Sequence, residues 1–337
     1  MATATIKDVA KEAGVGVGTV SRVINNSDAV SDSTRHKVLS AIATLDYTPN
    51  ANARRLSLGK TMTIAVIVPF FTRPSVVERL RGIEKVLAAS DYDLILYNVE
   101  TVHRRRDCFQ NVSRRERVDG MIIISLMPTD AEAERLKQTG VPIVLVDTHH
   151  AEFDSIMIDD VAGAYRATRH LIDLGHTKIA HIGDFVDNPF NFQQIHDRYQ
   201  GYRQALKEAN IPFRADYHLE GEHSRREAQR LAYEVLTNHD PPTAIFTFSD
   251  TQAIGVLEAA RGLGVHVPEQ LSVIGYDDIE IAEYLHLTTI RQSLFQSGLD
   301  GGQLLLETMA IRDQKPQEYL LPTELIVRGT TAPPPTT

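Results

Sequence analysis

The chain has 337 residues and a formal net charge of −9, and it is long enough to form two or three domains with well-buried cores. It contains no apolar run long enough to span a membrane and no signal peptide, and its only cysteine, Cys108, excludes an intrachain disulfide. We therefore expect a cytoplasmic protein without membrane contacts. The overall acidic charge, taken alone, argues against DNA binding.

The distribution of charge reverses that argument. Residues 1–60 contain eight Lys and Arg residues against five Asp and Glu residues, a net charge of +3, so the remainder carries −12. A basic head on an acidic body is typical of a DNA-binding domain joined to a regulatory domain.

The basic head is predicted to form three short helices. Apolar residues recur at helical spacing from Ile6 to Ala13, Gly14 ends the first helix, and a second helix begins near Val17. Ser31 is the expected N-cap of a third helix, whose inner face is Val38, Leu39, Ile42 and Leu45. This is the helix-turn-helix pattern, in which the second helix enters the major groove of DNA. The alternative is a helical cap or dimerisation arm that binds no nucleic acid.

The outer face of the second helix carries the expected DNA contacts. Arg22 is the best candidate for a bidentate contact to guanine, while Thr19, Ser21 and Asn25 can reach phosphates or base edges. Glycines at positions 16 and 18 are expected to weaken this helix by roughly 1 kcal/mol at an interior position. We therefore expect weak base discrimination and a larger contribution from operator shape.

The residues from Asp8 to Asn25 fit the pattern D-V-A-x-x-A-G-V-x-x-x-T-V-S-R-V-x-N, which resembles the headpiece signature of the LacI/GalR family of bacterial repressors. In that family the side chains at positions 17 and 18 select the operator; here they are small. Together the pattern and the resemblance imply these DNA-binding residues: Thr5, Val17, Gly18, Thr19, Ser21, Arg22, Asn25, Ser31, Thr34, Tyr47, Asn50, Ala53 and Leu56.

Residues 50–58 follow the headpiece. Read alone they are a charged linker, but the resemblance implies a hinge helix that folds on the operator and enters the minor groove. Leu56 matches the family's wedge between base pairs, and Ala53 permits close packing in the groove. A hinge of this kind would let a distant ligand control DNA affinity.

From Thr61 onward, apolar strands alternate with helices, which predicts parallel sheets covered on both faces. This alternation of strands and helices occurs twice along the chain, so we expect two lobes. The resemblance implies a periplasmic-binding-protein-like fold with the ligand between the lobes. The predicted fold class is an all-α helix-turn-helix headpiece plus an α/β domain of two parallel-sheet lobes. The predicted boundaries are 1–49 for the headpiece, 50–60 for the hinge, about 61–159 plus 293–318 for lobe 1, about 160–290 plus 319–330 for lobe 2, and 331–337 for a flexible tail.

Ligands of such sheets bind beyond the carboxyl ends of the strands. Strand ends, loops and family positions together give these candidate effector contacts: Phe71, Arg73, Ser125, Asp147, Phe192, Arg198, His223, Ser249 and Asp277. Carboxylates beside an arginine suit the vicinal hydroxyls of a sugar. Asp250 and Asp278 are expected to cap helices instead. A phosphosugar remains an alternative because of Arg73, as do a nucleobase and a protein corepressor.

Other classes of function fit less well. Asp159–Asp160 and Asp277–Asp278 are not the separated carboxylates that glycosidases need, and the histidines lack zinc-ligand spacing. We therefore expect no catalytic residues, no metal and no cofactor. A solute-binding protein for transport is a further alternative. The resemblance implies a homodimer, because the family members that form tetramers append a leucine-heptad helix and this sequence shows no such heptad. We expect the dimer to bind a pseudo-palindromic operator and to be released from it by a sugar.

Overall fold

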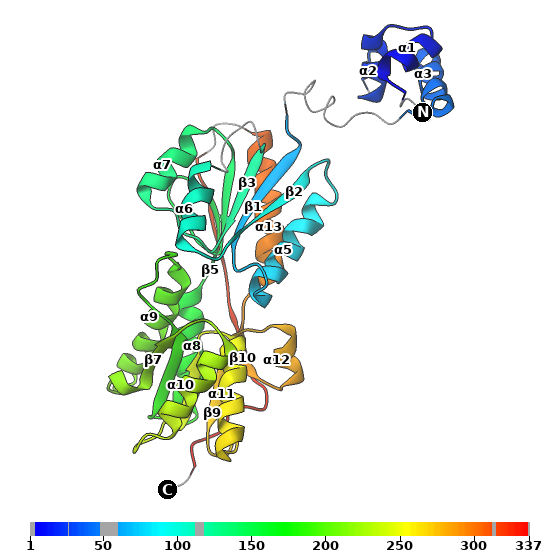
Figure 1. Cartoon of the computed structure of the whole chain (residues 1–337). Helices are drawn as coiled ribbons and strands as arrows, with labels where there is room; N and C mark the ends of the chain where they lie inside the picture. The colour runs from blue at the N-terminus through cyan, green and yellow to red at the C-terminus, as the bar shows by residue number, and fades with distance from the viewer. Residues whose placement is uncertain (1–3, 26, 48–59, 112–117, 312–314, 336–337) are drawn as a thin grey trace. The chain divides into compact units, whose positions relative to one another are not determined.

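The structure, a computed structural model, describes residues 4–25, 27–47, 60–111, 118–311 and 315–335. The chain divides into two compact units, Met1–Thr61 and Met62–Thr337. The described part of the first unit is helical, and the second unit contains two six-stranded sheets with their helices (Figure 1).

The first unit contains α1 (Ile6–Glu12), α2 (Val17–Ile24) and α3 (Asp32–Thr44) in its described residues. Its buried core consists of Val9, Ala10, Val20, Val23, Val38 and Ala41. Gly14 has a φ of +65°, the left-handed conformation that glycine adopts without strain, and it turns the chain from α1 towards α2. The predicted helix-turn-helix is therefore present.

Leu39 does not face this core as predicted, because its side chain is 50% exposed. Val38 and Ala41 are buried, and Ile42 and Leu45 pack partly against them. These four residues follow one another at spacings of three, one and three, so they share one helix face. Leu39 lies about 100° further round the helix than Val38, which places it on the outer side.

The second unit is organised as two lobes, each built on one sheet. The first sheet has the order β11-β5-β4-β3-β1-β2, and its paired strands are all parallel. Its strands are β1 (Thr63–Pro69), β2 (Asp93–Val99), β3 (Gly120–Ile124), β4 (Ile143–Val146), β5 (Asp154–Ile158) and β11 (Glu318–Leu321). The buried strands β1, β3 and β4 have apolar side chains packed on both faces, as continuous apolar runs predict.

The second sheet has the order β12-β10-β9-β8-β6-β7, and only β12 runs antiparallel to its neighbour. Its strands are β6 (Ile179–Asp184), β7 (His218–Gly221), β8 (Ala244–Thr247), β9 (Ser272–Asp277), β10 (Thr288–Arg291) and β12 (Glu324–Ile326). The two-lobed parallel architecture expected from the sequence is therefore correct.

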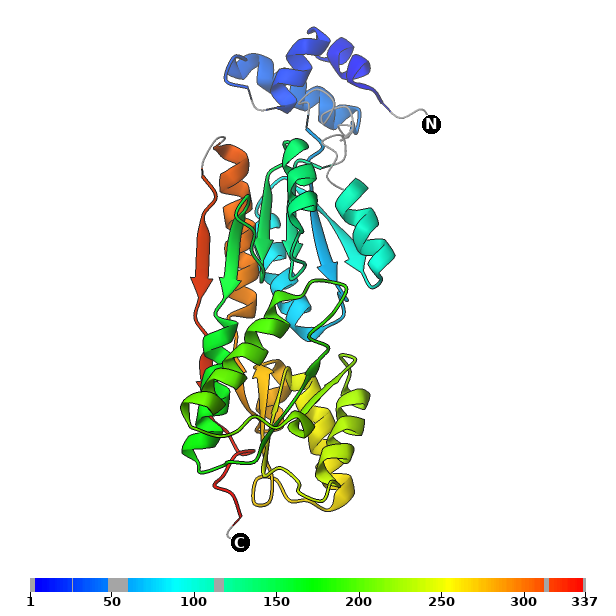
Figure 2. The ribbon, with the colours of Figure 1, turned by 90° about the vertical axis from the view of Figure 1, so that its left-hand side faces the viewer.

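Helices follow the strands in both lobes (Figure 2). Lobe 1 has α5 (Pro74–Leu87), α6 (Val102–Asn111), α7 (Asp130–Gln138) and α13 (Leu294–Ala310), and lobe 2 has α8 (Asp160–Asp173), α9 (Gln193–Glu208), α10 (Arg225–Leu236), α11 (Asp250–Leu263) and α12 (Glu280–Tyr284). Helices α5 and α13 pack through Gly82 and Gly298, because a Cβ on Gly298 would lie 1.9 Å from the carbonyl oxygen of Arg79.

Two predicted boundaries are corrected by the structure. The chain does not return to lobe 2 after residue 318, because β11 pairs with β5 in the first sheet as far as Leu321. The tail beginning at Thr331 is not free either. The Ala332 carbonyl lies 2.8 Å from Nε2 of the buried His176, and the Ala332 N–H donates to Ser272 Oγ at 3.0 Å. Residues 336–337 of that tail lie outside the described residues.

Candidate DNA-binding face and effector cleft

The start of α2 presents small residues. Gly16 has extended backbone angles (φ −76°, ψ 153°) and is the N-cap, so the predicted helix penalty applies to Gly18 and not to Gly16. Val17 is 42% exposed, and Gly18 and Arg22 are exposed as well. These three positions are accessible on the outer face of α2.

The other polar residues of α2 are half-buried. The Asn25 amide donates weakly to Ser21 Oγ at 3.5 Å, and Asn25 Oδ1 is buried without a hydrogen-bond partner among the described residues. Thr19 is half-buried on the same helix. Thr19, Ser21 and Asn25 are therefore less accessible than Val17, Gly18 and Arg22.

The predicted contacts outside α2 have partners within the headpiece. Both the N–H and the hydroxyl of Thr5 donate to Asp8 Oδ2, at 2.9 and 2.7 Å, which closes the start of α1. Ser31 Oγ lies 3.0 Å from Thr34 Oγ1, and Tyr47 packs against the core. Asn50, Ala53 and Leu56 lie outside the described residues.

A cavity of about 30 Å³ lies between the two lobes. Eight of the nine predicted effector residues line it. The complete lining is Pro69, Arg73, Ser75, Val76, Arg79, Ser125, Asp147, Phe192, Gln194, Arg198, His223, Phe248, Ser249, Asp277 and Gln292. The cleft is too small for a sugar in this conformation, so ligand entry requires the side chains or the lobes to move.

Phe71 is the predicted residue that does not line the cavity. Its side chain is 41% exposed, and its N–H donates to Asn98 Oδ1 at 3.1 Å. The chain turns at Phe70, which has a φ of +44°, and this turn brings Arg73 to the cavity.

A hydrogen-bonded chain of side chains joins the two lobes. Arg79 Nη2 donates to Asp147 Oδ1 at 2.6 Å and to Gln292 Oε1 at 2.9 Å. Gln292 Nε2 donates in turn to Asp277 Oδ1 at 2.5 Å. Because Asp147 follows β4 in lobe 1 and Asp277 ends β9 in lobe 2, a change at either carboxylate reaches the other lobe through Arg79 and Gln292.

Arg198 is bound largely by lobe 2 itself. Its Nε donates to Asp160 Oδ1 at 2.8 Å, its Nη1 donates to the Phe248 carbonyl at 2.6 Å, and its guanidinium lies 3.8 Å from the Tyr276 ring centre. Asp277 Oδ1 is further away, at 3.7 Å. The remaining donors of the guanidinium are the ones that could serve a ligand.

Burial shifts the protonation of the cleft carboxylates. It raises the pKa of Asp147, against the opposing effect of the Arg79 charge. It also raises the pKa of Asp277 to about 6, although Arg198 and Arg79 act in the opposite direction. Shifted carboxylates that converge on one cavity are typical of binding sites.

The backbone is strained at three residues of the cleft lining and at Phe70, which lies outside that lining. Phe70, Ser125, Asp147 and Asp277 follow or end four strands, and their φ values are +44°, +58°, +62° and +118°. Non-glycine residues adopt positive φ at a cost of about 1–3 kcal/mol each, and such residues cluster at functional sites.

Arg79 and Gln292 were not predicted as cleft residues, although the sequence contains a signal for each. Arg79 lies at helical spacing between the buried residues Val76 and Ile83 of α5, where an apolar side chain is expected. Gln292 directly follows β10, at a strand's carboxyl end.

Ser249, rather than Asp250, caps α11. Ser249 Oγ accepts the Gln252 N–H at 3.3 Å. Asp250 instead accepts the Thr289 hydroxyl at 2.6 Å and the Ile279 N–H at 2.9 Å. Asp278 forms ion pairs with two arginines at 2.7 Å, so it is not a helix cap either.

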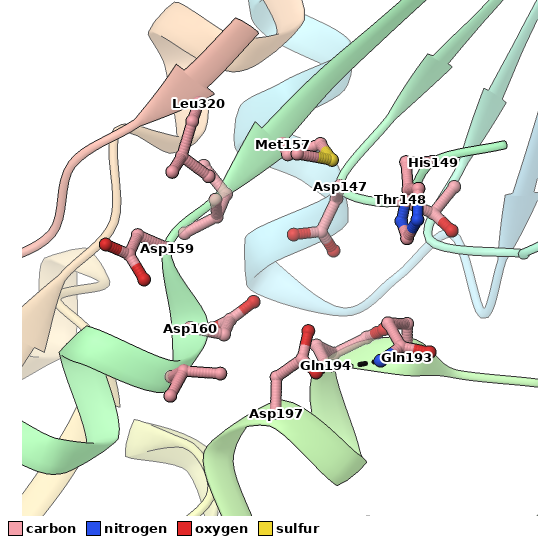
Figure 3. A pocket seen from close by; sticks show the side chains of 12 residues that line it. Asp147, Thr148, His149, Met157, Asp159, Asp160, Gln193, Gln194, Asp197 and Leu320 are labelled. Atoms are coloured by element: carbon pink, nitrogen blue, oxygen red, sulfur yellow. Dashed lines mark hydrogen bonds between the residues drawn. The ribbon is translucent and has the colours of Figure 1, made fainter. Parts of the chain in front are cut away.

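A second cavity, of about 230 Å³, adjoins the first and shares Asp147 and Gln194 with it. The carboxyl groups of Asp147, Asp160 and Asp197 point towards one space in Figure 3, and Asp159 lies beside them. Among the described residues, no arginine or lysine lines this cavity, and His149 is the basic side chain in its lining.

The described residues contain no group of three or more His, Cys, Asp or Glu side chains arranged to hold a metal ion. Among the same residues, no helix is long and apolar enough to cross a membrane.

Comparisons with known proteins agree with this architecture. Residues 5–50 match the model of bacterial regulatory proteins of the lacI family, and residues 168–331 match the periplasmic-binding-protein-like domain. The chain is 36% identical over 332 residues to the HTH-type transcriptional repressor PurR of Vibrio vulnificus, covering 97% of this chain and 98% of the relative.

Two solved structures are similar over nearly the whole chain. The transcriptional regulator CelR in complex with cellobiose has a TM-score of 0.72 at 30% identity, covering 97% of this chain and 99% of that one. The lac repressor dimer bound to operator and the anti-inducer ONPF has a TM-score of 0.85 at 28% identity, covering 98% and 100%. The chain therefore belongs to the LacI family of DNA-binding transcriptional regulators.

Proposed function

We propose that the chain is a repressor that binds a pseudo-palindromic operator as a homodimer and is released when a sugar binds between its lobes. The observation that carries the effector part is the chain from Asp147 through Arg79 and Gln292 to Asp277. A ligand hydroxyl that bonds to either carboxylate competes with this chain. Ligand binding therefore changes the contacts between the lobes.

Two structures of relatives support a sugar as effector: the CelR regulator in complex with cellobiose, and a LacI-family regulator from Enterococcus faecium with bound ribose, which is 32% identical to this chain. Aspartates and arginines suit such ligands because each hydroxyl is both a donor and an acceptor.

Exposed apolar side chains support dimerisation of the second unit. Tyr284 is 80% exposed and Ile281 39% exposed on α12, while Leu94 and Ile95 are exposed on β2, the edge strand of the first sheet. β2 and α12 both lie on the right-hand side of the second unit in Figure 1. An exposed apolar edge strand favours association in solution, and a second copy of this chain would bury it.

The test is operator selection with the full-length protein, followed by DNA release in a panel of mono- and disaccharides. We expect selected sequences to be pseudo-palindromic and at least one sugar to weaken binding. Asp277→Asn should reduce the response to that sugar at least tenfold while operator binding persists. Arg203→Ala, on the exposed side of α9, is the matched control and should respond normally. Stronger DNA binding with the sugar would identify a corepressor instead.

A further inference from the structure

Arg73 is a cation of the cleft without an anionic partner. It has no ion pair or hydrogen bond to a carboxylate among the described residues. Its guanidinium lies 4.2 Å from the Phe70 ring centre and 6.0 Å from that of Phe192. Aromatic rings hold the guanidinium plane in position and leave its edge donors available.

The position of Arg73 in the fold also favours binding of an anion. It is the N-cap of the 14-residue helix α5, with Pro74 in the first turn, and Ser75 and Val76 of that turn also line the cavity. Pro74 has no N–H, and the Val76 and Val77 N–H groups donate to the Arg73 carbonyl at 3.0 Å, so the Ser75 N–H is the one in this turn without a partner among the described residues. The helix dipole adds partial positive charge at this end. The N-terminus of α5 and Arg73 therefore face the same space.

A second, independent feature points to a ligand at this end. Arg79 lies within α5 and is only 2% exposed, and its Nε is buried with no hydrogen-bond partner among the described residues. It lines the same cavity as Arg73. Leaving a charged donor unsatisfied is costly, and an acceptor on a ligand would remove that cost.

Burial lowers the pKa of Arg73, and the more distant charges of Asp184 and Asp277 only partly oppose this. A ligand anion placed beside the guanidinium would stabilise its charge further.

The neighbouring cavity is lined by acidic side chains, in contrast to the end of the cleft that contains Arg73 and Arg79. Its lining contains Asp147, Asp159, Asp160 and Asp197, and neither arginine nor lysine (Figure 3). Asp147 and Asp160 are paired with Arg79 and Arg198, but Asp159 and Asp197 have no arginine or lysine partner among the described residues. An anionic group is therefore disfavoured there, whereas hydroxyl donors would be accepted. A ligand that spans the shared residues Asp147 and Gln194 therefore has one favoured orientation.

We propose that the effector is an anionic sugar whose phosphate or carboxylate binds to Arg73, Arg79 and the N-terminus of α5, with its hydroxyls directed towards Asp147 and Asp277. This inference rests on the proposed function and specifies the chemical class of its ligand. Arg73 is then the residue that distinguishes anionic sugars from neutral ones, because it is the cleft arginine without a protein anion.

The experiment is calorimetric titration of the full-length protein with three sets of probes: hexose phosphates, hexuronates and their neutral parent hexoses. We expect an anionic member to bind at least tenfold more tightly than its parent, and the phosphate and carboxylate sets identify which anion is used. Arg73→Gln should remove this preference and leave affinity for the neutral parent within about twofold. Arg81→Gln is the matched control, since Arg81 is an exposed residue of the same helix paired with Glu78.

Three results would overturn the inference. If a neutral sugar binds as tightly as its anionic derivative, the anion site is wrong and the proposed function stands. If Arg73→Gln weakens both kinds of sugar equally while far-ultraviolet circular dichroism is unchanged, Arg73 does not select for charge. If no sugar of either class binds, both the inference and the sugar-responsive function fail.

Discussion

The guanidinium of Arg79 and the carboxylate of Asp147 form a buried ion pair at 2.6 Å, with side chains 2% and 4% exposed. The carboxylate also accepts the Ser125 hydroxyl at 2.6 Å. Both partners are thus desolvated and held by further hydrogen bonds, which is the condition under which loss of one charge is most damaging.

Arg79→Met should lower the free energy of unfolding of the second unit by about 3–5 kcal/mol, because it leaves the Asp147 charge buried without a cation. Urea denaturation measures this. Adding Asp147→Leu should recover part of the loss, so the double variant should be more stable than the sum of the single changes predicts. Arg81→Met removes an exposed pair and should cost less than about 1 kcal/mol. Equal losses for Arg79 and Arg81 would contradict the prediction.

Asp277 should give the protein an unusual pH dependence. Its pKa in the folded protein is about 6, above the usual 3.8, so between these values the folded protein binds a proton that the unfolded chain has released. The stability that Asp277 contributes is therefore full below about pH 4, falls as the pH rises to about 6, and is constant above.

The check is to measure the free energy of unfolding of wild type and of Asp277→Asn between pH 4.5 and 8. The stability of wild type relative to the variant should fall up to about pH 6 and then level off. Asp240→Asn, compared with wild type between about pH 2 and 4.5, is the control of opposite sign. Hydrogen bonds from Lys178 and Arg214 lower the Asp240 pKa to about 2, so its contribution is present above about pH 4 and is lost as the pH falls towards 2. Parallel curves for wild type and Asp277→Asn would refute the assignment.

Gly18→Ala should stabilise the headpiece. A Cβ at Gly18 meets nothing within 4 Å and the residue is helical, so the change removes backbone entropy without a clash. The expected gain is about 0.5–1 kcal/mol. Thermal unfolding of the isolated residues 1–61 measures it, and Gly14→Ala, at φ +65°, should instead destabilise the headpiece. A gain at Gly14 would contradict the assigned turn.

Tyr284→Asp should shift the protein from dimer to monomer, because it places a charge in an apolar surface that we assign to the interface. Sedimentation velocity over a range of concentrations gives the dissociation constant, which should rise at least tenfold. Val327→Asp changes another exposed apolar residue (57% exposed), outside the proposed interface, and should leave the dimer intact. An unchanged dimer in the Tyr284 variant would move the interface elsewhere.

The elements that the sequence predicts correctly are those with strong local patterns. The continuous apolar runs of β1 and β3 and the glycine stop after α1 depend only on neighbouring residues. Strands β5 (Asp154–Ile158) and β7 (His218–Gly221) have no such pattern, because they are short and only partly apolar. Propensity is weak in such segments, and pairing with β4 and β6 decides their conformation.

The cleft residues also divide into those that the sequence predicts and those that only the folded structure reveals. Asp147 and Asp277 were predicted from strand ends, which are visible along the chain. Arg79 was not, because its partners Asp147 and Gln292 lie 68 and 213 residues away in sequence. Only the folded chain shows that this arginine in an apolar stripe has acceptors, because α5 packs against α13 and Arg79 reaches Gln292, which follows β10. Conversely, Phe71 lies in the predicted loop but faces solvent, because one residue in a turn decides the direction of its neighbours.

The close packing of α13 on α5 has a genetic consequence. Any side chain at Gly298 must push the backbone of Arg79, since its Cβ would fall 1.9 Å from that carbonyl oxygen. The displacement moves Arg79 relative to Gln292, although Gly298 is not part of the cleft lining. A screen for alleles that repress but no longer respond to the effector should therefore recover substitutions of this glycine, in the interior of a helix, alongside those of the binding residues themselves.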